Sequence, residues 1–185
     1  MMTPSPQRPG SGESRRRLEE MLRVDHAGEL AAVHIYRGQS RVFSDTPHRE
    51  LSRQFTCMQG EEQVHLDAFE TLLREKNIRP TLMTPVWRVA ATALGVGTAL
   101  LGEKAAHACT EAVEAVIGEH YAGQVAELED TDPELAAQLS QFRDDELGHH
   151  DQAIAQGAHE APAYPLLSAV VQAGCRLAIR ISEKI

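Results

Sequence analysis

The feature that most constrains this chain is a repeat of long helix-forming segments, offset by 84 or 85 residues. The segments are rich in Ala, Leu, Glu, Gln and Arg, whereas β-branched runs are few and no Asn-Gly turn signal occurs. Glu29 lies 33 residues before Glu62, and Glu114 lies 32 residues before Glu146. This spacing predicts two equivalent helical hairpins and therefore an all-α fold.

Four segments are expected to form a helical bundle, and two more apolar segments stand outside it. Capping residues followed by proline mark expected helix starts at Thr46-Pro47, Thr84-Pro85 and Asp132-Pro133. The expected bundle helices are residues 14–43, 47–76, 103–129 and 133–157. The two further segments, residues 85–101 and 165–185, need an explanation of their own.

Length and charge narrow the class of protein. A chain of 185 residues is long enough for one domain with a sizeable core. Its net charge of −9 disfavours nucleic acid as a partner, since that would need a basic patch. The three cysteines are widely spaced and fit a reducing compartment.

The N-terminus is rich in Pro, Ser, Gly and Arg and lacks the apolar core of a secretory signal. We expect residues 1–21 to form a disordered leader, whose end overlaps the first expected helix, and residues 22–185 to form the domain. A mitochondrial transit peptide is the alternative. The leader is short and interrupted by Glu13, which favours a bacterial cytoplasmic origin.

Two Glu-x-x-His motifs lie inside helices that should bury apolar faces. Glu62 precedes His65 and Glu146 precedes His149 by three residues, nearly one helical turn, so each pair can point to one side. One such motif on a solvated face would mean little. Two, each preceded by a helix with a glutamate at matching distance, follow the ligand plan of ferritin-like di-metal carboxylate bundles.

Charge balance supports this interpretation, because four carboxylates neutralise two divalent ions, whereas four buried carboxylates without metal would be very costly. Oxygen and imidazole ligands without thiolate suit iron or manganese, and we expect two iron ions per chain. The alternative is six exposed polar residues on an ordinary bundle. The candidate ligands are Glu29, Glu62, His65, Glu114, Glu146 and His149. Competing residues nearby are Glu61, Glu111, Glu119, His107, His120, Asp144, Asp145 and His150.

The repeat extends beyond the candidate ligands. Tyr36 and Tyr121 each follow a candidate glutamate by seven residues, two turns along the same face. Buried tyrosines satisfied by hydrogen bonds explain them at least as well as a redox role does, so we interpret them only as residues that support the ligands or line a pocket. Asp25 and Asp144 are the expected hydrogen-bond partners of the ligand histidines.

The two apolar segments favour contact with a membrane surface. Residues 87–101 are apolar except for Arg88 but are too short to span a bilayer comfortably. The C-terminal segment places Arg176 and Arg180 one turn apart beside an apolar face. Core packing or a dimer interface explains either segment alone equally well. Both segments in one short chain favour the membrane.

Several stretches closely resemble the demethoxyubiquinone hydroxylases of ubiquinone biosynthesis, from about Leu22 to the C-terminus. They are long and stand in the same order as in that family, which makes the resemblance more specific than the ligand spacing. The stretches are LRVDHAGELAAVHIYRGQ, EEQVHLDAF, LGVGTALLGEKAAHACTEAVEAVIGEHY, FRDDELGHHD and APAYPLLSAVVQAGCRLAIRISE.

The resemblance implies a di-iron monooxygenase that uses O2 to hydroxylate the ring of a polyprenylated demethoxyubiquinol. It implies a ferritin-like four-helix bundle with two further membrane-associated helices, located peripherally on the cytoplasmic face of the bacterial cell membrane. It also implies a homo-oligomer or a partner protein of ubiquinone biosynthesis. The family's six iron ligands fall on the six candidates named above, without substitution.

Two other functions compete with this one. A different activity on the same bundle, such as peroxide reduction or oxygenation of another substrate, would share the fold. A storage ferritin would not need the two apolar segments, and rubrerythrin-type peroxidases often add a cysteine iron site that this chain lacks. The non-enzymatic alternative is a lipid- or prenyl-binding accessory protein with a structural metal site.

Overall fold

A computed structural model describes residues 11–45 and 47–185 of the chain. Within these ranges the protein is helical and contains no strand, which confirms the all-α prediction. The elements are α1 (Ser11–Phe43), α2 (Arg49–Glu75), α3 (Thr84–Leu100), α4 (Glu103–Leu128), α5 (Pro133–Ala155), the short 3-10 helix η1 (Ala158–Glu160) and α6 (Tyr164–Ser182).

The structure confirms one of the three N-caps that the sequence predicts. Asp132 caps α5, because its side chain accepts a hydrogen bond from the Leu135 amide at 3.2 Å. Thr84 is instead the first residue of α3, and its hydroxyl donates to the Thr81 carbonyl oxygen. Thr46 lies outside the described residues, as do residues 1–10 of the expected leader, whereas residues 11–21 belong to α1.

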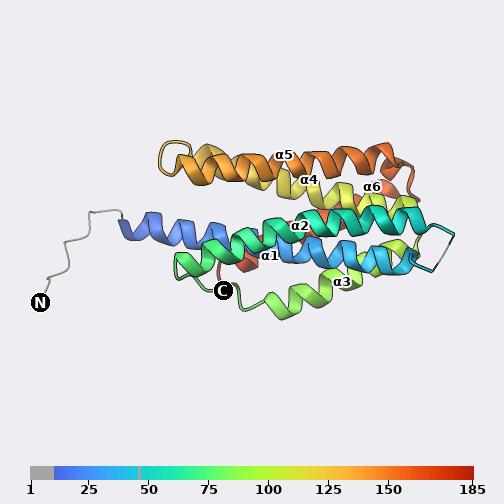
Figure 1. The fold of residues 1–185 in the computed structure, drawn as a ribbon, viewed down its shortest axis with the longest axis horizontal. Coiled ribbons are helices and arrows are strands. Elements are labelled where there is room, and N and C mark those ends of the chain that lie inside the picture. Colours follow the sequence, from blue (N-terminus) through green and yellow to red (C-terminus); the bar gives the residue numbers. More distant parts are fainter. Residues whose placement is uncertain (1–10, 46) are drawn as a thin grey trace, which may run out of the picture.

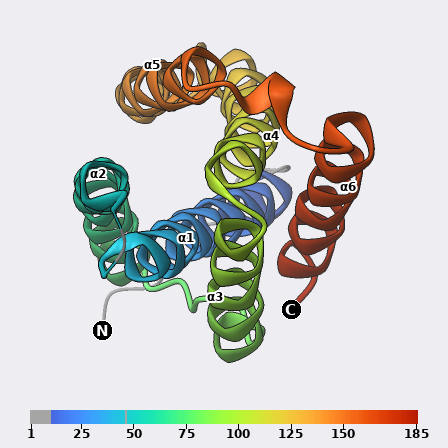
Figure 2. The same cartoon turned by 90° about the vertical axis from the view of Figure 1, so that its right-hand side faces the viewer.

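The six helices form three layers. Figure 2 shows α1 and α4 in the middle, with α2 and α5 on one side and α3 and α6 on the other. Helices α1 and α2 pack as one hairpin and α4 and α5 as the second, as the repeat predicts (Figure 1). Helix α3 packs mainly on α1, and α6 mainly on α4. Each central helix therefore has two faces that contact different neighbours.

Apolar clusters occupy both ends of the bundle interior. One includes Phe43, Phe55 and Met58, and the other includes Leu22 and Phe69, all almost fully buried. Burial of a large apolar side chain stabilises a fold by about 1.5–3 kcal/mol. The two clusters therefore provide the stability that lets a polar centre be buried between them.

Helix α3 approaches α1 closely because glycines lie at the contact. A Cβ atom added to Gly95 would overlap the carbonyl oxygen of Ile35. A Cβ atom on Gly38 would lie 3.0 Å from the carbonyl oxygen of Thr92. One side of α3 is thus held against the bundle.

The other sides of α3 and α6 are open to solvent. Large apolar side chains are exposed on α3 at Val86, Val89 and Leu100, and on α6 at Val170 and Leu177. No helix in the described ranges combines the length and apolar character that crossing a bilayer requires.

Candidate metal centre and adjoining pocket

All six candidate ligands meet in the interior between α1, α2, α4 and α5. Their side chains are buried, with at most 5% of any residue exposed. They form two groups, in each of which one ligand atom per residue lies within 4.8 Å of the others. Glu62 and Glu146 belong to both groups, so they lie between two candidate metal positions. The groups are Glu29, Glu62, His65 and Glu146, and Glu62, Glu114, Glu146 and His149.

The histidine Nδ1 atoms face the carboxylates. His65 Nδ1 lies 3.3 Å from Glu146 Oε1 and 3.5 Å from Glu29 Oε2. His149 Nδ1 lies 2.8 Å from Glu62 Oε1 and 3.6 Å from Glu146 Oε2. Because Glu and His three residues apart share one helix face, each Glu-x-x-His motif delivers both side chains to the same centre.

The inward-facing atoms suit a metal. Several buried atoms make no hydrogen bond of good geometry, although His149 Nδ1 and Glu62 Oε1 lie within ion-pair distance; these atoms are both carboxylate oxygens of Glu62 and of Glu146, and Nδ1 of His65 and His149. Buried polar groups normally have partners, so a concentration of unpartnered acceptors indicates a ligand site. Oxygen and imidazole donors of this kind fit iron or manganese.

The electrostatics indicate a deficit of positive charge. Burial raises the pKa of Glu29 well above its ordinary value, and the charges of Glu146 and Glu62 act in the same direction. The pKa of Glu114 is raised for the same reasons. Two divalent cations would relieve this repulsion, because they balance four carboxylates.

The histidines partly compensate the carboxylates while no metal is bound. Burial lowers the pKa of His65, but contacts with Glu146, Glu29 and Glu62 outweigh it and raise that pKa to about 12. Burial also lowers the pKa of His149, but contacts with Glu146 and Glu62 outweigh it and raise that pKa to about 11. The pKa of Glu146 falls to about 2, because the two imidazoles outweigh its burial. The imidazoles of His65 and His149 are therefore protonated at the place where a metal would bind.

The outer nitrogens of the two histidines contact acids from the opposite hairpin. His65 Nε2 lies 3.2 Å from Asp145 Oδ2, and His149 Nε2 lies 2.7 Å from Glu61 Oε2. The prediction that Asp25 and Asp144 take this role is wrong, since Asp144 contacts Arg143 on the surface and Asp25 contacts other side chains, described below. The sequence signal was the acid immediately before each motif glutamate, at Glu61 and Asp145.

The two repeated tyrosines link the hairpins. The Tyr36 hydroxyl donates to Glu114, and the Tyr121 hydroxyl donates to Glu29. Each tyrosine therefore contacts the candidate ligand of the other hairpin rather than that of its own helix. This agrees with the interpretation as buried, hydrogen-bonded tyrosines and places both beside the carboxylates.

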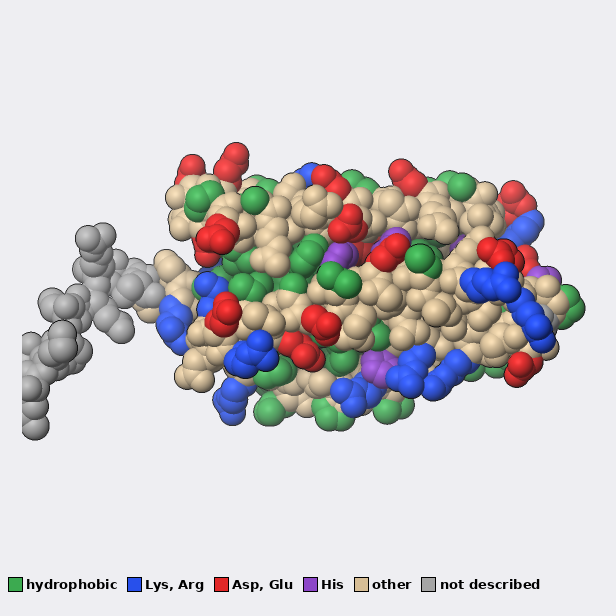
Figure 3. Space-filling view, in the orientation of Figure 1, with side chains coloured by type: hydrophobic (Ala, Val, Ile, Leu, Met, Phe, Trp, Pro, Cys, Tyr) green, Lys and Arg blue, Asp and Glu red, His purple; other side chains and the backbone are tan. Residues whose placement is uncertain are grey.

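The other competing residues lie outside the two metal-binding groups. Glu111 lies 3.7 Å from His150, and Glu119 forms a surface ion pair with Arg176 at 3.3 Å. His107 packs against Phe55, and burial lowers its pKa to about 4. Figure 3 shows histidine and acidic side chains along the seam between α5 and α2, where the outer ends of the centre approach the surface.

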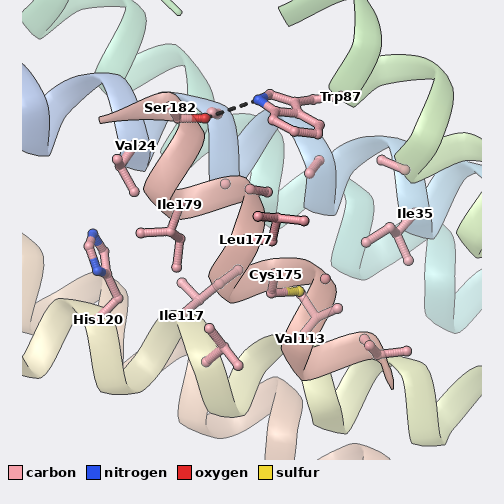
Figure 4. A pocket seen from close by; sticks show the side chains of 18 of the residues that line it. Val24, Ile35, Trp87, Val113, Ile117, His120, Cys175, Leu177, Ile179 and Ser182 are labelled. Atoms are coloured by element: carbon pink, nitrogen blue, oxygen red, sulfur yellow. Dashed lines mark hydrogen bonds between the residues drawn. The ribbon is translucent and has the colours of Figure 1, made fainter. Parts of the chain in front are cut away.

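An apolar cavity of about 390 Å³ lies on the opposite faces of α1 and α4, beneath α3 and α6. Figure 4 shows Ile117 of α4, Trp87 of α3 and Cys175 and Ile179 of α6 around it. The Trp87 indole nitrogen donates to the Ser182 hydroxyl at 3.0 Å. Tyr121 lines this cavity and its hydroxyl donates to Glu29, so this side chain contacts both the cavity and the centre.

Comparison with known proteins gives one family. Residues 16–182 match the model of the family described as Ubiquinone biosynthesis protein COQ7. The chain belongs to this family. The match begins at Arg16, inside α1, and so extends the resemblance seen in the sequence. The buried Glu and His groups are thus a candidate metal centre in a COQ7 family protein.

Similar COQ7 family proteins come from bacteria and eukaryotes. The 3-demethoxyubiquinol 3-hydroxylase of Rhodospirillum rubrum is 45% identical over 178 residues, covering 96% of this chain and 82% of that protein. Proteins named NADPH-dependent 3-demethoxyubiquinone 3-hydroxylase, mitochondrial, are 46% identical in Caenorhabditis elegans, covering 91% and 90% of the two chains, and 44% identical in Homo sapiens, covering 93% and 80%.

Proposed function

We propose that this protein is an O2-dependent di-iron monooxygenase that hydroxylates the ring of a polyprenylated demethoxyubiquinol in ubiquinone biosynthesis. The observation that carries the proposal is the pair of buried carboxylate–histidine groups that share Glu62 and Glu146. Family membership supports the reaction, since similar proteins are named hydroxylases of this ubiquinone intermediate. The cofactor is two iron ions per chain.

Six residues would hold the irons. Glu29 and His65 would bind at one position, Glu114 and His149 at the other, and Glu62 and Glu146 between the two. Bound there, the irons would supply electrons and activate dioxygen, so that one oxygen atom enters the ring and the other leaves as water. The six ligands are Glu29, Glu62, His65, Glu114, Glu146 and His149.

The surrounding residues orient these ligands. Asp145 and Glu61 accept hydrogen bonds from the outer histidine nitrogens, so each Nδ1 faces inward, where it would bind metal after releasing its proton. Tyr36 and Tyr121 donate to Glu114 and Glu29 and restrict the rotation of those carboxylates. Apolar side chains at both ends exclude water from the centre.

The cavity beneath α3 and α6 supports a quinol with an apolar tail. Its walls are almost entirely apolar, which suits an isoprenoid chain. Tyr121 lies between the cavity and Glu29, so a ring bound there would be next to the carboxylates. The tail would then leave between α3 and α6.

The exposed faces of α3 and α6 support peripheral contact with the cytoplasmic face of the bacterial membrane. Cations lie near the exposed face of α3: burial lowers the pKa of His34, and the charges of Arg88, Arg37 and Arg41 lower it further. Figure 3 shows basic side chains in a row along the α3 edge of the molecule, next to hydrophobic ones. This combination is typical of surfaces that bind anionic lipid.

Vesicle flotation tests the membrane contact. Arg176 and Arg180 lie on α6 beside its exposed apolar face. The double variant Arg176→Glu/Arg180→Glu should bind anionic vesicles at least about tenfold more weakly, since each basic residue contributes about 1 kcal/mol. Arg49→Glu/Arg53→Glu on α2 is the matched control. Equal binding of all three proteins would favour a homo-oligomer interface or a surface for a biosynthetic partner protein.

Mass spectrometry with isotopically labelled dioxygen tests the reaction. Iron-loaded protein in detergent is mixed with demethoxyubiquinone, a reductant and 18O2. One labelled oxygen atom on the ring is expected. No product from protein that holds about two irons per chain would contradict the hydroxylase and favour a peroxidase or an accessory protein.

A further inference from the structure

A buried polar cluster lies at the edge of the apolar cavity and outside the metal centre. It consists of Asp25 on α1 and His120 and Gln124 on α4. The Gln124 amide nitrogen lies 2.8 Å from Asp25 Oδ1 and 2.9 Å from His120 Nε2. Asp25 and His120 both line the cavity, and Figure 4 shows the His120 ring directed toward Val24 and Ile179.

Asp25 is a buried carboxylate with one unused acceptor atom. Its residue is only 3% exposed, and its Oδ2 atom has no hydrogen-bond partner. An unpaired buried carboxylate oxygen is costly, and it is stabilised when a donor enters the cavity. The neighbouring donors are already used, because Tyr121 donates to Glu29 and Trp87 donates to Ser182.

The cluster breaks the internal repeat. At the 85-residue offset, Asp25 corresponds to Thr110, and Ile35 corresponds to His120. The repeat is kept at Gln39, the counterpart of Gln124, whose side chain satisfies the backbone carbonyl of Ala106. An acid and an imidazole thus occur at only one of two equivalent positions, although Ile35 at the other position also lines the cavity. This asymmetry fits a ligand that binds at one place.

We propose that Asp25, held by Gln124 and His120, accepts a hydrogen bond from a ring hydroxyl of the substrate, so that the cavity binds the quinol in preference to the quinone. This inference rests on the proposed function and specifies the oxidation state that the site recognises. A quinol hydroxyl is a donor and satisfies Asp25 Oδ2. A quinone oxygen is only an acceptor and would face the carboxylate with lone pairs on both sides.

The electrostatics of the cluster agree with a hydrogen-bonded carboxylate. Burial raises the pKa of Asp25 above its ordinary value, while His120, Gln124 and Arg17 act in the opposite direction. His120 Nε2 also lies 3.5 Å from Asp25 Oδ1. The Gln124 amide nitrogen donates to Asp25 Oδ1 and lies within hydrogen-bond distance of His120 Nε2, so Asp25 Oδ2 remains the free acceptor of the cluster.

The oxidation state matters because similar proteins carry names of both kinds. The Rhodospirillum rubrum protein is named for the quinol, and those of Caenorhabditis elegans and Homo sapiens for the quinone. Recognition by Asp25 would mean that reduction of the ring precedes productive binding in this chain.

Binding can be followed through the single tryptophan, Trp87, which lines the cavity. The full chain is loaded with Zn²⁺, which exchanges no electrons with the ring, and is titrated without oxygen. The ligands are a short-chain demethoxyubiquinol, the matching quinone, and the quinol with both hydroxyls methylated. We expect the quinol to bind roughly tenfold or more tightly than the other two, as for a hydrogen bond to a charged group.

Asp25→Asn provides the matched variant, because it keeps the shape and removes the charge. It should lose the preference for the quinol, leaving affinities within about threefold, or should favour the quinone, to which an amide can donate. Asp130→Asn, at an exposed position, is the control and should retain the preference. Circular dichroism establishes folding, and the three ligands test the wild-type protein even if Asp25→Asn does not fold.

Two results would overturn the inference. One is equal affinity of the wild-type protein for the quinol, the quinone and the methylated ring. The other is an unchanged preference in folded Asp25→Asn protein. The labelled-oxygen experiment distinguishes these results from failure of the proposed function, because hydroxylated product would still form if only the role of Asp25 were wrong.

Discussion

The candidate metal centre and the apolar cavity lie on opposite faces of the same two helices, α1 and α4, yet they differ in symmetry. The centre repeats almost residue for residue, since the pair His65–Asp145 matches the pair His149–Glu61. The cavity does not repeat, because its polar cluster occurs once. Two similar metal ions favour equivalent ligands, whereas a single asymmetric substrate favours different residues on the two halves.

The largest expected effect comes from removing a shared ligand. Glu62→Ala should abolish turnover and lower iron affinity by more than about 100-fold, beyond the loss typical of outer-shell partners. Removing Glu62 also takes away a carboxylate that faces both protonated imidazoles, so the metal-free variant should unfold at a lower temperature than wild type. Iron analysis, turnover and calorimetry measure these effects. Glu75→Ala, exposed on the same helix, is the control, and full activity in Glu62→Ala would contradict the assignment.

The second effect is the pH dependence of metal binding. In metal-free protein the pKa values of His65 and His149 are about 12 and 11, so both imidazoles are protonated near neutral pH. Metal at each Nδ1 must displace one proton, so the affinity for each Mn²⁺ ion should rise by about tenfold per pH unit. Titrations from about pH 6 to 8 measure the slope. A flat profile would show that the imidazoles do not bind metal.

A smaller effect is expected for the acids behind the histidines. Glu61→Ala and Asp145→Ala should each weaken metal binding by about 10–100-fold, because the histidine loses its orienting acceptor. Asp144→Ala is the matched control, because Asp144 lies next to Asp145 in the chain but contacts Arg143 instead of a histidine. Isothermal titration with Mn²⁺ compares the three variants. Equal losses in all of them would mean that surface charge, rather than orientation, controls affinity.

The smallest expected effect is a change in stability from substitutions in α3, which should leave the candidate metal centre unchanged. Gly95→Ala places a methyl group against the Ile35 carbonyl and should destabilise the protein by about 1–3 kcal/mol. Gly97→Ala has open space and should stabilise α3 by up to about 1 kcal/mol. Denaturant unfolding measures both changes, and metal content should stay constant. Loss of iron in Gly95→Ala would show that the two regions depend on each other.

The sequence was sufficient for the six candidate ligands to be predicted as a group. Helical periodicity makes the Glu-x-x-His spacing informative, and the offset selects Glu29 and Glu114 from nearby acids. The contacts across helices were not predictable, because the register between hairpins does not follow from spacing. For this reason the tyrosine partners were not foreseen and the acids behind the histidines were assigned wrongly.

The apolar segments were harder to interpret from sequence. Residues 85–101 suggested a membrane surface, and the structure adds that Gly95 brings one side of α3 against α1 while Val86 and Val89 remain exposed. A sequence of small and apolar residues cannot distinguish packing from exposure on each face. Asp25 illustrates the same difficulty, since a polar residue near a ligand can face the metal centre or the cavity on the other side.

Anomalous X-ray diffraction at the iron edge tests the central claim most directly. Crystals of iron-loaded protein should show two peaks, about 3.5–4 Å apart, with one beside His65 and the other beside His149. Glu62 and Glu146 should lie between the peaks. A single peak, or a peak beside Asp25 and His120 instead, would contradict the di-iron centre.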